Sequence, residues 1–165
     1  MKKLLTTATL ISLFAFGFSA NANVTLEKSN SNELSVVLNS DSNIYGLQFD
    51  LNYDAQKIKL SEEAINHMFS SNDIRSNMSV YSKIKEPGLA RVIMFDLNGQ
   101  PIISSNTTEN VLSLSYENLS TDAKFSITLD NIVAAGLHGE EVNVSVNDVF
   151  DFNSESGNVL PGETQ

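Results

Sequence analysis

Few residues of this sequence could carry out catalysis. There are two histidines, His67 and His138, and no cysteine, which excludes thiol chemistry. Neither histidine belongs to a metal-ligand or nucleophile pattern. Glycoside hydrolysis usually needs two carboxylates that face each other across a cleft, whereas the acidic pairs here are only neighbours in sequence. These pairs are Glu62–Glu63 and Glu140–Glu141. The sequence therefore predicts a protein that is not an enzyme and that uses no cofactor.

One segment has some features of a calcium loop. The stretch DFNSESG places oxygen-bearing side chains at alternating positions, at Asp151, Asn153 and Glu155. Such a loop needs glycine at its sixth position and a bidentate acid at its twelfth. Ser156 and Gly162 occupy those positions. The segment therefore favours a flexible acidic tail over a metal site, and calcium binding by the tail stays open.

The N-terminal segment has the three parts of a secretory signal peptide. MKK supplies a positive end, ATLISLFAFGF an apolar core and ANA a small-residue cleavage site. The apolar run is shorter than the ~20 residues that a spanning helix needs. We predict a signal peptide at residues 1–22, a domain at 23–148 and a tail at 149–165. The product is expected to be secreted, either to a periplasm or out of the cell.

Composition narrows the class of partner. The chain has 165 residues, with 10 Lys and Arg against 20 Asp and Glu, so its formal net charge is −10. Such a charge repels phosphate backbones and anionic lipid surfaces, which argues against nucleic acid and membrane partners. Without cysteine, an exported domain is stabilised by core packing and not by disulfides. The length suits one domain.

Alternation of apolar and polar residues dominates the remaining chain and indicates β-strands. Strands are expected at 24–28, 34–38, 44–60 with a turn at DAQ, 78–84, 89–97, 101–105, 111–118, 124–135 and 141–149. One helix is expected at Glu62–Phe69, with Ser61 as its N-cap. Many short strands with one minor helix indicate an all-β antiparallel sandwich or barrel.

The stretch GLQFDLNYD shows the alternation most clearly. Side chains of a strand point alternately to its two sides. One side carries Leu47, Phe49, Leu51 and Tyr53, and we expect these residues to enter the core. The other side carries Gly46, Gln48, Asp50 and Asn52, which we expect to face outward.

The stretch RVIMFDL alternates in the same way, but both of its sides are apolar. If Ile93, Phe95 and Leu97 face the core, the outward set is Val92, Met94 and Asp96. This set would be a partly apolar surface that suits a contact site. Periodicity alone leaves open the opposite register, or a strand that is covered on both sides.

Three stretches together cover most of Ile44 to Val146: IYGLQFDLNYDAQKIKL, then GLARVIMFDLNGQPI followed by VLSLSYEN, and FSITLDNIVAAGLHGEEVNVSV. They resemble the cohesin modules of cellulose-degrading assemblies. The resemblance implies a jelly-roll β-sandwich without catalytic activity. It also implies that one flat sheet face receives a small helical partner, the dockerin, by hydrogen bonds at the rim and apolar contact at the centre.

The resemblance also assigns places in that contact. Gly46 and Gln48 stand where the family often has polar contact residues, and Met94 stands where it has an apolar one. We therefore predict a partner-binding surface on the two neighbouring strands, made of Gly46, Gln48, Asp50, Asn52, Val92, Met94 and Asp96. On this hypothesis Met94→Asp abolishes partner capture and leaves the melting temperature nearly unchanged.

A carbohydrate-binding module that recognises polysaccharide is the alternative, because such modules share the sandwich architecture. Sugar sites usually stack aromatic rings on sugar faces. The chain has no Trp and four Tyr. With Tyr53 assigned to the core, Tyr45, Tyr81 and Tyr116 remain as candidates, and they form no recognisable row.

Overall fold

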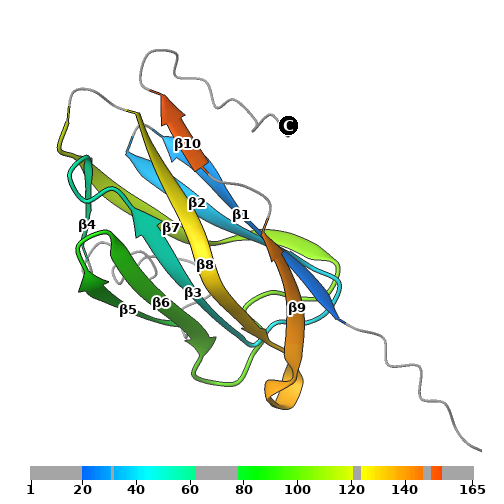
Figure 1. Ribbon diagram of the computed structural model, residues 1–165. Helices are drawn as coiled ribbons and strands as arrows, with labels where there is room; N and C mark the ends of the chain where they lie inside the picture. Colours follow the sequence, from blue (N-terminus) through cyan, green and yellow to red (C-terminus); the bar gives the residue numbers. More distant parts are fainter. Residues whose placement is uncertain (1–19, 31, 62–77, 121–123, 147–149, 154–165) are drawn as a thin grey trace, which may run out of the picture.

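A computed structural model describes residues 20–30, 32–61, 78–120, 124–146 and 150–153 (Figure 1). The strands are β1 (Asn21–Asn30), β2 (Glu33–Ser40), β3 (Gly46–Tyr53), β4 (Ile58–Leu60), β5 (Met78–Glu86), β6 (Leu89–Asp96), β7 (Thr107–Asn118), β8 (Lys124–Ala135), β9 (Glu141–Val146) and β10 (Phe150–Asn153). A short 3-10 turn, η1 (Leu137–Gly139), connects β8 to β9. The helix expected at Glu62–Phe69 lies outside the described residues. Within them, no helix is both long and apolar enough to cross a bilayer.

The strands form one curled sheet that folds into two layers (Figure 1). Its order is β4-β7-β2-β1-β9-β8-β3-β6-β5, with β10 paired to β8. Among the described strands, only β1 and β9 pair in parallel, and β9 also pairs antiparallel with β8. β9 therefore joins the layer β4-β7-β2-β1 to the layer β8-β3-β6-β5. This arrangement is the predicted all-β sandwich with jelly-roll topology.

The core lies between the two layers and follows the alternation of the sequence. Leu47, Phe49 and Leu51 of β3 are buried, as predicted, and they belong to one cluster with Leu34 and Val36 of β2. Tyr53 packs, partly buried, against this cluster. Burial of each large apolar side chain contributes about 1.5–3 kcal/mol, so the alternating pattern accounts for the layered packing.

The predicted direction of the β6 side chains is wrong. Val92 and Met94 are fully buried, whereas Ile93 is 39% exposed. Met94 lies opposite Leu47 across the strand pair, so it shares the core side with that residue. Both alternating sets of β6 are largely apolar, so apolar alternation alone does not decide between them.

The polar residue Asp96 favours its own set, with Val92 and Met94, as the outward side of β6. This indication is wrong because Asp96 is the last residue of the strand, where a turn begins. Its carboxylate oxygen accepts hydrogen bonds from the backbone N–H groups of Asn98 (2.7 Å) and Gln100 (3.2 Å). A carboxylate that caps a turn in this way satisfies local backbone donors and does not report which side of the preceding strand faces water.

Three segments differ from the predicted boundaries. Residues 101–105 make only an isolated bridge, between Ile44 and Ile103. Ile102 and Ile103 are buried in the core, and this burial explains why the segment is apolar although it forms no strand. β10 lies inside the segment predicted as a tail and pairs with β8. β1 begins at Asn21, two residues before the predicted mature start at Asn23. The cleavage position itself stays a prediction.

The turn between β5 and β6 depends on Gly88. Its φ is +90°, and a Cβ at this position would lie 2.7 Å from the backbone oxygen of Tyr53. The Gly88 carbonyl also accepts a hydrogen bond from the Tyr53 N–H at 2.9 Å. Glycine thus lets the β5–β6 hairpin lie against the end of β3, which aligns these strands side by side.

Candidate functional site

The outer side of the β8-β3-β6-β5 layer, which we call the patch face, is arranged in rows by the strand register. One row consists of Tyr81, Ile93, Gln48 and Val133. The next consists of Ser79, Phe95, Gly46 and Ala135. Gly46 and Gln48 of β3 therefore lie between apolar side chains of β6 and β8.

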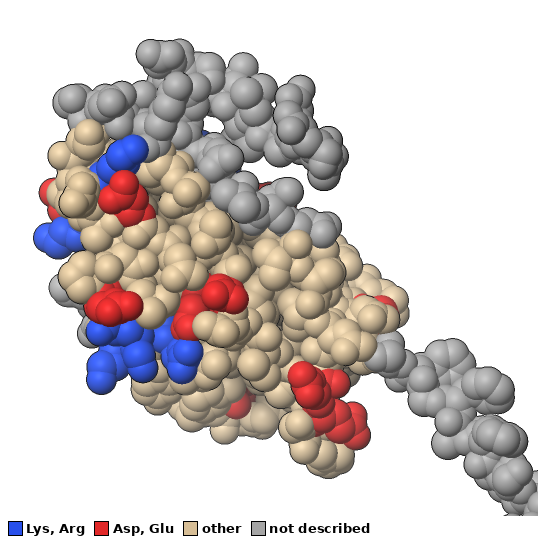
Figure 2. Space-filling model, in the orientation of Figure 1, with Lys and Arg blue, Asp and Glu red and all other residues tan. Residues whose placement is uncertain are grey.

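Four side chains in these rows, Tyr81, Ile93, Phe95 and Val133, make up the apolar patch. Tyr81 is 57% and Val133 50% exposed. The rings of Tyr81 and Phe95 are stacked, with centroids 5.8 Å apart and an angle of 18° between their planes. Figure 2 shows this side of the molecule, where uncharged side chains cover much of the described surface. Apolar groups that gather on one exposed sheet face are typical of an interaction site.

Gly46 leaves room beside this patch. A Cβ at this position would lie 3.7 Å from the Ala135 Cβ and 3.8 Å from the Met94 backbone oxygen, which are ordinary contact distances. Gly46 is therefore not required by the local packing. The side chain of any residue placed there would project onto the patch face, because position 46 shares its side of β3 with Gln48.

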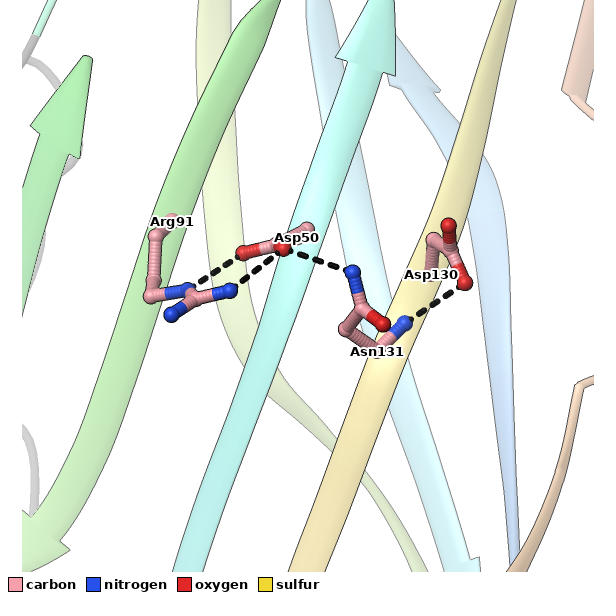
Figure 3. Close-up of polar contacts among 4 residues, drawn as sticks. All are labelled: Asp50, Arg91, Asp130 and Asn131. Carbon is pink, nitrogen blue, oxygen red and sulfur yellow. Dashed lines mark hydrogen bonds and ion pairs between the residues drawn. The ribbon is translucent and has the colours of Figure 1, made fainter. Parts of the chain in front are cut away.

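A charged cluster borders the apolar patch (Figure 3). Arg91 of β6 donates from Nε to Asp50 Oδ1 at 2.6 Å and from Nη2 to Asp50 Oδ2 at 2.7 Å. Asn131 of β8 donates from its side-chain amide to Asp50 Oδ2 at 2.9 Å. A register shift in β8 and a φ of +48° at Asn131 bring this amide to Asp50.

These contacts decide the ionisation of the cluster. The Arg91 hydrogen bonds hold the pKa of Asp50 below its ordinary value against the opposing effect of burial, and the Asn131 bond acts in the same direction. The same hydrogen bonds with Asp50 raise the pKa of Arg91. The pair is therefore ionised at neutral pH, with the carboxylate almost covered by its partners.

The structure separates the seven predicted contact residues into three groups. Gly46, Gln48 and Asn52 lie on the patch face and are partly exposed. Asp50 points to the same face but is buried beneath its hydrogen-bonding partners. The remaining three are not exposed on the patch face. Val92 and Met94 are in the core, and Asp96 caps a turn.

Sequence reasoning missed Ile93, Phe95 and Val133 as outward residues. A signal for two of them was present in β6, because Arg91 shares their side of the strand. An arginine in mid-strand is a better marker of the outward side than an aspartate at the strand end. Val133 carried no such signal, because the Asn131 bulge changes the alternation of β8.

The histidines and acidic pairs form no catalytic arrangement in the described part of the chain. His138 is exposed in η1, and Glu140 and Glu141 are exposed beside it, while His67 and the pair Glu62–Glu63 lie outside the described residues. No group of three or more possible metal-binding side chains occurs in the described ranges.

Comparisons with known proteins agree on one family. The Cohesin domain family model matches residues 20–156. No curated protein matches the sequence.

Solved structures of similar fold cover most of the chain. A non-cellulosomal cohesin from the archaeon Archaeoglobus fulgidus has a TM-score of 0.59 and 14% identity, over 83% of this chain and 94% of that one. A type II cohesin domain from the cellulosome of Acetivibrio cellulolyticus has a TM-score of 0.58 and 13% identity, over 83% and 96%. The sixth cohesin of scaffoldin B from the same species, solved in complex with a mutant Cel5 dockerin, has a TM-score of 0.55 and 16% identity, over 76% and 94%. At these identities the likeness shows the fold alone.

Proposed function

The chain belongs to the cohesin domain family, and on that premise we propose that it is a secreted, non-catalytic recognition module that binds a dockerin-like helical protein through the patch face. The observation that carries this proposal is the apolar patch itself, which lies on an exposed sheet face where a helical partner can be received. A structural relative was solved with a dockerin bound. The predicted signal peptide supports export.

The arrangement of the face suits such a partner. Gln48 lies in the same row as Ile93 and Val133, so a partner that covers these apolar groups also meets an amide that can donate and accept hydrogen bonds. Contact of this kind combines an apolar centre with a few polar groups, which is the usual anatomy of a protein interface.

The test is binding to purified dockerin-like modules encoded in the genome of the source organism, measured by isothermal titration calorimetry. At least one should bind the wild-type protein, and Ile93→Asp and Gly46→Trp should each abolish this binding. Thr108→Asp is the matched control, because Thr108 is exposed on β7 in the opposite layer. The proposal would be contradicted if no module bound the wild-type protein. It would also be contradicted if Thr108→Asp abolished binding while Ile93→Asp and Gly46→Trp did not.

Polysaccharide binding is the second candidate, and the exposed ring of Tyr81 favours it. Of the other tyrosines considered, Tyr116 is buried and packs edge-to-face on Phe125, with ring centroids 5.5 Å apart. Burial raises the pKa of Tyr116. Retention of the protein on insoluble polysaccharide, lost with Tyr81→Ala, would support this candidate over the protein partner.

A further inference from the structure

A basic corner, which consists of Lys83, Lys85 and Arg91, lies beside the apolar patch on β5 and β6. Lys83 is the cross-strand partner of Arg91, and Tyr81 and Ile93 pair in the same way two residues along. Both lysines are exposed. Figure 2 shows basic side chains gathered on the β5–β6 side of this face. This concentration is notable in a chain with twice as many acidic as basic residues.

The ion pair of Arg91 with Asp50 leaves the basic character of this corner intact. Of the two side chains, 36% of Arg91 is exposed but only 4% of Asp50. The positive member of the pair is therefore the one that an approaching partner meets. Lys85 also attracts the Asp50 carboxylate and helps to lower its pKa.

Arg91 is held in place before any partner arrives. Asp50 binds Nε and Nη2 of the guanidinium, and Asn131 fixes the same carboxylate from the opposite strand. Its third nitrogen, Nη1, has no bond to Asp50 and can serve a partner. A pre-ordered arginine loses less side-chain entropy on binding than a mobile one.

Most exposed acidic groups of the patch face lie on its other side, towards β8 and β9. Asp130 of β8 is exposed and is separated from Arg91 by Asp50 in the strand register. Glu140 and Glu141 are exposed in the connection that follows η1 and at the start of β9. Glu86, exposed at the end of β5, pairs with Leu89 and is the acidic neighbour of the basic corner. Three basic side chains against this one exposed carboxylate leave the β5–β6 side basic on balance, whereas the side towards β8 and β9 is acidic.

We propose that the basic corner recognises a carboxylate of the partner, so that the module selects a helical partner with acidic side chains at one rim of its apolar contact surface. This inference rests on the proposed function. Charge complementarity of this kind accelerates encounter, fixes orientation and rejects partners that place a basic group there. Because the patch face is basic on one side and acidic on the other, one orientation of the partner is favoured, in which its acidic rim lies over β5 and β6.

The experiment selects binders from one displayed dockerin-fold scaffold, whose contact-helix positions are varied among Asp, Asn and Lys. The purified wild-type protein is one bait, and the double variant Lys83→Glu/Lys85→Glu is the other. This variant reverses the corner without removing the Arg91–Asp50 pair. We expect Asp to be enriched by the wild type and Lys by the variant, and a wild-type binder to lose about tenfold in affinity towards the variant.

Rate measurements add a second readout. Association of a wild-type binder should slow as NaCl is raised from about 50 mM to about 500 mM, and this dependence should weaken or reverse with the double variant. Thr108→Asp should change neither rate nor affinity.

The outcomes separate the two proposals. Binders that are lost with Ile93→Asp but show no charge preference would overturn the basic-corner inference and leave the proposed function standing. If no binder depends on Ile93, the proposed function itself fails. Lysine-dependent retention of the protein on dextran sulfate, competing with the selected binders, would show instead that the corner serves a polyanion, and this would also overturn the inference.

Discussion

The two outer faces of the sandwich carry different chemistry. The patch face combines exposed Tyr81, Ile93 and Val133 with a basic corner. The outer side of the β4-β7-β2-β1 layer and of the adjoining strand β9, which we call the amide face, carries short amide and hydroxyl side chains. They include Asn23, Thr25, Ser35, Asn39, Thr108, Asn110, Ser113 and Ser145.

Side chains of the amide face bind mainly one another. Asn23 donates to Ser145 Oγ at 3.1 Å, and Asn110 donates to Ser35 Oγ at 3.0 Å. Ser145 and Ser35 belong to β9 and β2, so these bonds connect neighbouring strands and occupy polar groups that a ligand would otherwise use.

This contrast shows how one fold separates stability from recognition. Both faces cover the same core, and their inward alternation is equivalent. On the amide face, however, outward polar groups bind one another, whereas on the patch face apolar surface and the partly exposed guanidinium of Arg91 remain available to a partner. A partner gains most where desolvation of the free surface costs least, which favours the patch face.

The largest expected effect tests which side of β6 faces the core and which side contributes to the patch face. Met94→Asp should lower the free energy of unfolding by about 4 kcal/mol or prevent folding, because it buries a charge without a partner. Ile93→Asp, one residue away, should cost less than about 1 kcal/mol, since Ile93 is on the exposed side. Urea unfolding followed by circular dichroism measures both values. If Ile93→Asp instead lowered the free energy of unfolding more than Met94→Asp, the assignment of Met94 to the core side of β6 would be wrong.

The same strand shows what the sequence could and could not predict. Period-two alternation was enough for the sandwich class, because each strand must bury one side, and it was enough for β3, whose two sides differ in polarity. In β6 the sets that contain Met94 and Ile93 are both apolar. Arg91 on the Ile93 side was the one signal of direction within the strand, and the pairing with Leu47 and Gln48 of β3 fixes that direction in the fold.

Other parts of the site depend on interactions that leave no periodic signal. Asp50 was predicted on the correct side of β3, but its burial requires Arg91 and Asn131, which are 41 and 81 residues away in the sequence. The bulge at Asn131 also shifts the alternation that would have placed Val133 outward. A bulge is set by the geometry of two strands, so the sequence of β8 alone does not predict it.

A smaller effect is expected at the polar anchor of the patch face. Asp50→Ala should lower the free energy of unfolding by about 2 kcal/mol, because the buried carboxylate accepts three hydrogen bonds, two of them from Arg91. Asp130→Ala removes an exposed carboxylate of the same row that accepts one hydrogen bond, from the Asn131 N–H at 2.7 Å, and should cost less, about 1 kcal/mol or below. Equal losses in urea unfolding would show that burial of the Asp50 cluster contributes nothing.

The Asp50 contribution should also depend on pH. Its pKa in the folded protein is lowered from the ordinary value of 3.8, so its stabilisation is complete above that value and is lost as the pH falls through the lowered pKa. The difference in unfolding free energy between wild type and Asp50→Ala should therefore be full at neutral pH and should narrow below 3.8. A difference that widens in acid would contradict the assigned direction of the pKa shift.

The last prediction uses two surface variants that should change stability least, and it compares the apolar surface of the two faces directly. Ile93→Asp should shorten the retention of the folded protein on a hydrophobic interaction column, because it places a charge in the apolar patch. Thr108→Asp adds the same charge to the amide face, where its carboxylate can still accept the hydrogen bond from the Asn39 amide, and should alter retention much less. Both variants carry one added negative charge, so net charge cannot account for a difference between them. Equal shifts in retention would mean that the two faces present similar apolar surface, and the assignment of recognition to the patch face would lose its physical basis.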